Sequence, residues 1–468
     1  MRTELRAHRA LLLAVLLLAS PIGARGQEGV GASVVAARDT VRGGGVAPTA
    51  EPDWKWRFLD WNEIQTPILT LRVGAGLLVD HIGYTQDNPS GEQVALDPYV
   101  KFRDTRLILG GRIRSSRPIT WQTGFMWDWY QEKWFVRQTG LVVAVPEILG
   151  KLWVGRSKEG LSLNRVMVGY DGWTMERFPF SDASTPLLAD GIKWLGASPE
   201  NHLTWTLGAF TDWLSEGESF SYYERQVAGR LGYIRMDSES AGRLVHIGLG
   251  GRLGLPSEDS LQLRARPEVG AAPYIVDTGK FGSTLAGQVG VEAYYRSGPL
   301  LVGTEYYVED ARFSGGSVSR GPEAQPGAVD DQLPQILSLS PQVGVDAAAQ
   351  AVDPNHVVFH GGDLVAVWLI TGETRPYTTV GGFFAPVSPA RPVTAGGPGA
   401  WEAILRMSYI DLDNGPIRGG KFWRITPMVN WHLTDNVRLE LAYGYGILDR
   451  FDATGRTHFF QTRLQTQL

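Results

Sequence analysis

Arginine residues recur along this chain at positions that alternate with apolar residues, and they are the side chains best suited to bind a charged ligand. The set consists of Arg72, Arg106, Arg112, Arg114, Arg406, Arg424, Arg438 and Arg463. Three of them lie in one early segment, from position 106 to 114. Because a guanidinium stays protonated and donates two parallel hydrogen bonds to an oxyanion, such a set is suited to binding anions.

Patterns for covalent catalysis or metal binding are weak by comparison. The eight histidines are scattered, without a His-Glu-x-x-His motif, and no Gly-x-Ser-x-Gly nucleophile elbow occurs. His356 and His360 are four residues apart at the start of a predicted strand, where we interpret them as loop or lumen histidines. We therefore expect no enzyme active site, no metal site and no cofactor.

The arginines need elements that orient them, and the chain alternates in a way that does so. Near the C-terminus, Trp401, Leu405 and Tyr409 share one parity, while Glu402 and Arg406 share the other. Successive strand residues face opposite sides of a sheet, so each strand has one apolar face and one polar face. Three such segments in succession are typical of a barrel wall with lipid outside and water inside. A charge facing lipid at mid-bilayer costs about 2–4 kcal/mol, so we expect the arginines to face the lumen.

The same alternation recurs from Trp54 onward, and no helical period of any length appears. A barrel strand with half of its two connections takes roughly 25 residues. The sequence therefore predicts an all-β protein: a transmembrane antiparallel β-barrel of about 16 strands, within a range of 14 to 18, with long extracellular loops.

The N-terminus has the features of a cleaved secretory signal. Basic residues precede the apolar run Leu11 to Leu18, and Ala24-Arg25-Gly26 forms a small-x-small cleavage site. The predicted organisation is a signal peptide at 1–26, a flexible leader at 27–53 and a β-barrel at 54–468. The stretch 314–355, rich in Gly, Pro and Ala, is expected to be a long loop that is extracellular or folded into the pore. The Pro/Gly stretch at 385–398 is interpreted in the same way.

The composition agrees with export and an outer-membrane location. The chain has no cysteine, 57 glycines, 16 tryptophans and 16 tyrosines, and a formal net charge of -5. Aromatic residues are expected in the interfacial girdles of outer-membrane barrels. The acidic balance gives no indication of nucleic-acid binding.

Two blocks of residues carry a resemblance to a known family. One comprises Gly372-Glu373-Thr374-Arg375-Pro376-Tyr377, Gly399-Ala400-Trp401-Glu402, Tyr409-Ile410-Asp411-Leu412-Asp413, Asn430-Trp431 and Asn436-Val437-Arg438. The other comprises Val154-Gly155-Arg156-Ser157-Lys158-Glu159 and Met175-Glu176-Arg177. In order and approximate spacing, these blocks resemble the phosphate-selective porin O and P family.

The resemblance implies a 16-stranded, trimeric channel in the bacterial outer membrane that admits small anions such as phosphate. Its partners would be those anions, outer-membrane lipid and the barrel-assembly machinery. The family usually ends in an aromatic residue, whereas this chain ends in Leu468, although Phe460 and Leu464 still fit a closing strand. The resemblance also places Lys158 where a pore-narrowing loop begins; a solvated pair of Lys158 with Glu159 is the competing interpretation.

The leading hypothesis is a passive outer-membrane porin whose anion-contact candidates are Arg72, Arg106, Arg112, Arg114, Lys158, Arg406, Arg424 and Arg438. The same faces also carry acids such as Glu402, Glu440 and Asp128, so these arginines could equally be ordinary lumen charges. Three alternatives stay open. They are a barrel hydrolase acting on lipid or peptide, a barrel that binds a partner through its loops without an open pore, and a soluble secreted all-β protein.

Overall fold

The computed structural model describes residues 57–60, 62–128, 133–167, 169–211, 213–214, 221–236, 242–314 and 355–468. The predicted signal peptide, the predicted leader and all but the two end residues of the predicted loop at 314–355 lie outside the described residues. Those three predictions therefore remain predictions.

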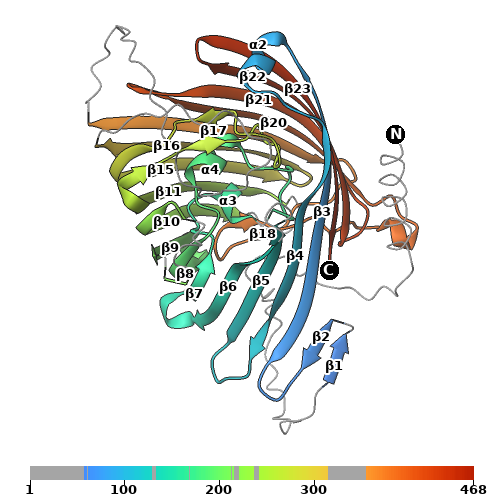
Figure 1. Ribbon diagram of the computed structural model, residues 1–468. Coiled ribbons are helices and arrows are strands. Elements are labelled where there is room, and N and C mark those ends of the chain that lie inside the picture. The colour runs from blue at the N-terminus through green and yellow to red at the C-terminus, as the bar shows by residue number, and fades with distance from the viewer. Residues whose placement is uncertain are drawn as a thin grey trace.

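Antiparallel strands close into a barrel, which confirms the predicted fold class and the predicted strand number (Figure 1). Within the described residues the wall has 16 strands. They are β3 (Thr70–Gln86), β4 (Tyr99–Ile113), β5 (Ile119–Asp128), β6 (Lys133–Val145), β7 (Gly150–Ser157), β8 (Ala189–Ser198), β9 (Leu203–Thr211), β10 (Tyr223–Met236), β11 (Leu244–Pro256), β15 (Phe281–Ser297), β16 (Leu300–Phe313), β17 (His356–Leu369), β20 (Ala400–Asn414), β21 (Ile417–His432), β22 (Val437–Arg450) and β23 (Ala453–Gln467). Each pairs with its neighbours in sequence, and β23 pairs with β3 to close the ring.

The remaining elements are short and lie in the connections. The helices are α2 (Asn88–Gln93), α3 (Leu163–Val166) and α4 (Pro179–Ser184), with single 3-10 turns η1 (Pro146–Ile148), η2 (Pro199–Asn201), η3 (Ser257–Asp259) and η4 (Val393–Ala395). The short strands are β1 (Arg57–Asp60), β2 (Glu63–Gln65), β12 (Ser260–Leu261), β13 (Arg264–Ala265), β14 (Val276–Asp277), β18 (Tyr377–Thr378) and β19 (Phe383–Phe384). No helix among the described residues is long and apolar enough to cross a membrane.

Burial alternates along the strands as the sequence pattern predicts. On β11, Ile247 and Leu249 are each 55% exposed on the outer surface, whereas His246 and Arg252 face inward and are almost fully buried. Outward apolar side chains can face lipid, and inward polar ones need partners inside the barrel. The alternation of the sequence therefore fixes which side chains can meet in the lumen.

Three connections fill part of the lumen, and each is named here by its residues: loop 158–188, loop 257–280 and loop 370–399. Figure 1 shows α3, α4 and β18 inside the ring of strands, and α4 contacts β13, β17 and β20. Loop 370–399 contains the stretch 385–398, for which an extracellular or pore position was predicted. It follows β17 and leaves the barrel at the end that also carries the connections 114–118 and 146–149 and Leu468. Loops 158–188 and 257–280 enter from the opposite end.

A buried ion pair joins the two strands that close the barrel. Arg463 on β23 donates to both carboxylate oxygens of Asp80 on β3, at 2.6 and 2.7 Å, and each side chain is 2% exposed. Arg463 Nη2 also donates to Glu176 of loop 158–188 at 2.7 Å. Removing one partner of such a pair leaves an unpaired buried charge, which costs more than an exposed pair is worth.

We expect Arg463→Met to destabilise the folded barrel by about 3–5 kcal/mol, because Asp80 would keep a buried charge without its partner. The matched control is Arg117→Met, since Arg117 makes an equally bidentate pair with Glu147, at 2.9 Å twice, with side chains 46% and 61% exposed. That change should cost no more than about 1 kcal/mol. The measurement is the temperature at which the folded, fast-migrating band is lost on a gel. If this temperature fell equally in the two variants, the buried pair of Arg463 with Asp80 would not have the stabilising role assigned to it.

Candidate functional site

Loop 158–188 turns into the lumen at a position that requires glycine. Gly160 has a φ of +90°, and a Cβ there would come within 2.3 Å of Thr206 Cγ2 on β9. A larger residue would therefore meet both backbone strain and a clash with the wall. This glycine allows the chain to leave β7 and run close along the inside of the barrel.

Two buried wall carboxylates hold the first helix of the loop. Glu292 accepts from the backbone N–H of Leu163 at 2.9 Å, and Glu305 accepts from the N–H of Asn164 at 2.6 Å and from the Ser162 hydroxyl. The first N–H groups of a helix have no partner within the helix, so these carboxylates satisfy them. Because Glu292 and Glu305 lie on β15 and β16, the loop packs against that side of the barrel and the lumen stays open on the β3–β6 side.

Arginine–carboxylate pairs fix the other two loops. Arg406 on β20 donates to the carboxylate of Glu268 in loop 257–280 and to the hydroxyl of Thr174 in loop 158–188, the latter at 2.9 Å. Within loop 370–399, Arg375 binds Glu402 of β20 at 2.6 Å and the backbone carbonyl of Asp171 at 3.0 Å. The three loops thus form one connected inner structure.

The open part of the lumen is a cavity of about 310 Å³ between these loops and the wall. Its lining comes from β3–β6, β23, loop 158–188 and loop 257–280. Among the described residues, eight arginines and four acids line it: Arg103, Arg106, Arg137, Arg165, Arg177, Arg264, Arg266 and Arg463, with Asp104, Glu176, Asp182 and Glu268. The formal charge of the cavity lining is therefore positive, whereas the whole chain has a formal net charge of -5.

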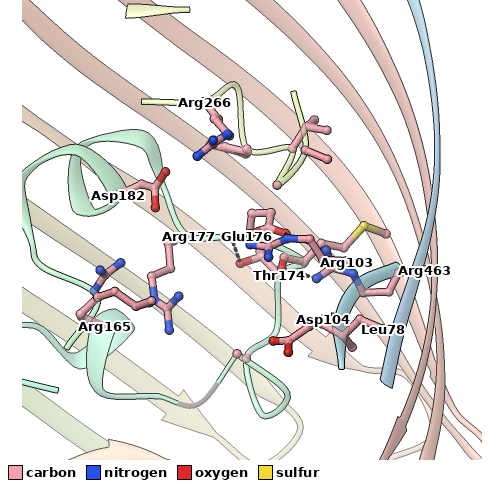
Figure 2. A pocket seen from close by; sticks show the side chains of 18 of the residues that line it. Leu78, Arg103, Asp104, Arg165, Thr174, Glu176, Arg177, Asp182, Arg266 and Arg463 are labelled. Atoms are coloured by element: carbon pink, nitrogen blue, oxygen red, sulfur yellow. Dashed lines mark hydrogen bonds and ion pairs between the residues drawn. The ribbon is translucent and has the colours of Figure 1, made fainter. Parts of the chain in front are cut away.

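Some of these charges are paired closely and others are not. Figure 2 shows Arg103 and Arg463 grouped around Glu176, and both are hydrogen-bonded to it. Arg106 and Arg137 share the single carboxylate of Asp104, with Arg137 at 3.5 Å. The excess positive charge therefore lies where β4 and β6 face loop 158–188.

On the loop side of the cavity, Arg165 and Arg177 lie next to each other (Figure 2). Burial, and then the like charges of the nearby Arg165 and Arg137, lower the pKa of Arg177 to about 9. The pKa of Lys158 is also lowered well below its usual value, by burial and then by Arg177. Among the carboxylates, Asp182 favours the charged forms of Arg165 and Arg177 most, with smaller effects of Glu159 on Arg165 and of Glu176 on Arg177. Cations outnumber acids on this side too.

The predicted anion-contact arginines on and just after the first two wall strands do not all lie at the cavity. Arg106 lines the cavity, where it binds Asp104 and stacks 4.6 Å from the ring centroid of Tyr170. Arg112 has the same inward parity but is exposed near the end of β4, and Arg72 is half-buried near the same end of the barrel. Arg114 lies one residue beyond β4, in the exposed turn.

The candidates on the C-terminal strands face inward but are buried by the loops. Arg406, Arg424 and Arg438 are each at most 4% exposed. Arg424 lies 3.7 Å from Glu268 and donates to Pro267 O, while Arg438 donates to the backbone carbonyl of Gly172 at 2.8 Å. These three arginines do not line the cavity; they hold the loops against the wall.

Lys158 does begin a loop that narrows the lumen, but the solvated Lys158–Glu159 pair does not form. Lys158 is half-buried beside Arg177, and its Nζ donates to the backbone carbonyls of Val166 and Met167, at 3.2 and 2.6 Å. Glu159 is 1% exposed and lies 3.5 Å from Arg252. The competing interpretation was therefore wrong.

Six of the eight arginines that line the cavity are ones that the alternation did not single out. Arg103 and Arg137 lie at irregularities where the register of β4 with β3, and of β6 with β5, skips residues. A bulge shifts the inward phase, so strict parity misses them. Arg165, Arg177, Arg264 and Arg266 come from the loops, where no strand period exists; the Met-Glu-Arg resemblance was the one signal for Arg177.

Residues 238–468 match the phosphate-selective porin O and P family. This range contains the C-terminal block of the predicted resemblance and confirms it. The block at 154–177 lies outside the matched range. A relative from Caulobacter vibrioides, described as an uncharacterized protein, is 34% identical over 107 residues. Those residues are 23% of this chain, and the match spans 21% of that relative's length.

Solved structures of outer-membrane proteins share the fold at low sequence identity. OmpT of Vibrio cholerae, in a trimer form, is 11% identical with a TM-score of 0.50, over 86% of this chain and 100% of that one. An anion-selective porin from Comamonas acidovorans is 11% identical with a TM-score of 0.48, over 86% and 100% of the two chains. The channel DcaP of Acinetobacter baumannii is 8% identical with a TM-score of 0.49, over 86% and 99%.

At this level of identity such similarity concerns the fold alone. The closed barrel therefore has the fold of outer-membrane porins, and over residues 238–468 the chain is similar to the phosphate-selective porin O and P family.

Proposed function

We propose that this porin is a passive diffusion channel that prefers small anions, phosphate among them. The observation that carries the proposal is the arrangement of charge across the cavity. Arg106 and Arg137 share one carboxylate on the wall, and Arg165 and Arg177 lie together on loop 158–188. Basic groups on both sides of a narrow passage favour anions over cations.

In this mechanism an anion loses part of its hydration shell in the cavity and exchanges it for guanidinium donors. The donors of Arg106, Arg137, Arg165 and Arg177 come from β4, β6 and loop 158–188, so the anion is contacted from more than one side. Most of these arginines also bind carboxylates or backbone carbonyls, which keeps any one contact weak enough for release. The flux follows the concentration gradient without a cofactor.

The proposal includes the route and assembly expected from the sequence. A signal peptide at 1–26 would direct export, the leader at 27–53 would precede the barrel, and the loop at 314–355 would lie at the extracellular end. We propose a homotrimer, in line with the family resemblance; the OmpT structure is itself a trimer form.

Arg165→Gln/Arg177→Gln should reduce anion selectivity in a planar bilayer. A unit charge about 7 Å from an ion is worth about 0.6 kcal/mol at the dielectric constant of water, or roughly a threefold change in local anion concentration. Losing two charges should therefore lower the local anion concentration by up to roughly sevenfold and raise the cation concentration by as much, so the anion-to-cation permeability ratio should fall by roughly tenfold or more. The ratio is measured from the reversal potential in a dilute potassium chloride gradient, because salt screens the effect.

The matched control for this experiment is Arg225→Gln, since Arg225 is exposed on the strand β10 and does not line the cavity. It should leave the reversal potential at the wild-type value. A cation-selective wild-type channel would contradict the proposal, and so would an unchanged anion-to-cation permeability ratio in the double variant.

Acidification should make the channel more anion-selective between pH 7.5 and pH 5. Burial raises the pKa of Asp171, in loop 158–188, to about 6, so this carboxylate is charged at pH 7.5 and largely neutral at pH 5. Protonation removes a negative charge near Lys158 and Arg106. Asp171→Asn fixes the neutral form, so its selectivity at pH 7.5 should already approach the wild-type value at pH 5. Identical pH profiles for the two proteins would argue against this role of Asp171.

A further inference from the structure

Apolar side chains of the cavity alternate with its cations. On the wall, Met126 of β5 is paired directly with Arg106 of β4, so both side chains project into the lumen side by side. Leu78 of β3 is paired with Asp104 in the same way. Met126 and Leu78 both line the cavity. The wall side of the cavity therefore carries apolar side chains next to its arginines.

The loop side repeats this arrangement. Arg177 Nη2 donates to the backbone carbonyl of Met167 at 3.3 Å. Arg165 donates to the backbone carbonyls of Thr185 and Pro186, directly before Leu187 in the chain. Met167 and Leu187 are among the residues that line the cavity, and Leu187 is the more exposed of the two. Arg165 and Arg177 thus each lie close to an apolar residue of the loop, as Arg106 does on the wall.

Some guanidinium donors in this region lack an acceptor. Among the described residues, no hydrogen-bond acceptor lies within reach of Arg165 Nη1, Arg177 Nε or Arg106 Nε, and these atoms are shielded from solvent. Arg165 as a whole is only 3% exposed. These shielded donors lie behind the cavity surface, so the partly exposed side chains of Arg106 and Arg177, which line the cavity, are the groups that an anion there can contact.

The apolar neighbours decide which anion gains most. A small inorganic oxyanion keeps a tightly held hydration shell and gains nothing from a methionine or leucine side chain. An organic anion uses both features, since its charged group meets the guanidinium donors and its hydrocarbon part removes apolar surface from water. Burying one methylene group is worth roughly a fourfold change in affinity.

We propose that this passage favours organic carboxylates with an apolar body of several carbons over inorganic oxyanions of equal charge. The inference rests on the proposed anion preference and adds the class of substrate. The carboxylate binds among Arg106, Arg165 and Arg177, and the apolar body lies against Met126 and Leu187.

The test is block of chloride current through the reconstituted channel by acetate, butyrate and hexanoate, which share one charge and differ only in methylene groups. The half-blocking concentration should fall by up to about fourfold per methylene group, and by roughly tenfold or more across the series. Inorganic phosphate, tested at the same charge by adjusting pH, should block less than hexanoate.

Met126→Gln and Leu187→Gln should flatten the dependence on chain length, because each replaces an apolar contact by a polar one. The matched control is Met407→Gln, since Met407 is 51% exposed on the outer surface of β20 and should keep the wild-type series. Heat-modifiable migration on a gel shows whether each variant is folded. Even if a variant does not fold, the block of the wild-type channel by acetate, butyrate and hexanoate shows whether an apolar body strengthens binding.

The outcomes separate the two proposals. An anion-selective channel that acetate and hexanoate block equally would overturn the preference for organic anions and leave the anion channel standing. Stronger block by phosphate than by hexanoate would do the same and favour a hydrated oxyanion. A channel without anion selectivity would remove the proposed function itself.

Discussion

The structure depends on how the backbone of loop 158–188 is satisfied inside the barrel. A chain segment in the lumen exchanges water for protein, and each unpaired N–H would cost free energy. Glu292 and Glu305 supply the acceptors for the first N–H groups of α3, and both carboxylates belong to neighbouring wall strands. This anchoring places the loop on one side of the barrel. The off-centre passage and the position of Arg165 and Arg177 follow from it.

The same constraint explains why lumen arginines have two different roles. Where loops cover the wall, arginines such as Arg406 and Arg438 bind loop backbone and carboxylates and are buried. Where the wall stays open, Arg106 and Arg137 remain at the cavity with one carboxylate between them. A single inward-facing residue type thus holds the loops on one side and supplies charge to the passage on the other.

The architecture could be predicted from the sequence because every strand repeats the same two-residue period. Inward placement of Arg406, Arg424 and Arg438 followed from that period, but their burial did not, since it depends on loops more than a hundred residues away in the chain. The period also failed at Arg103 and Arg137, where the register of the strands is irregular. Arg165 and Arg266 lie in loops, whose path is set by long-range contacts that a local pattern does not contain.

The central claim is that solutes pass between loop 158–188 and the wall strands β4 to β6 in a positive potential. Because the chain has no cysteine, a single cysteine at position 126 can report on this place directly. The measurement compares how fast Met126→Cys reacts with an anionic and with a cationic thiosulfonate reagent of similar size, relative to Ser115→Cys in the exposed turn after β4. The account predicts that position 126 is modified, that the current falls, and that the ratio of rates shifts toward the anionic reagent. An unreactive position 126, or a ratio shifted toward the cationic reagent, would contradict it.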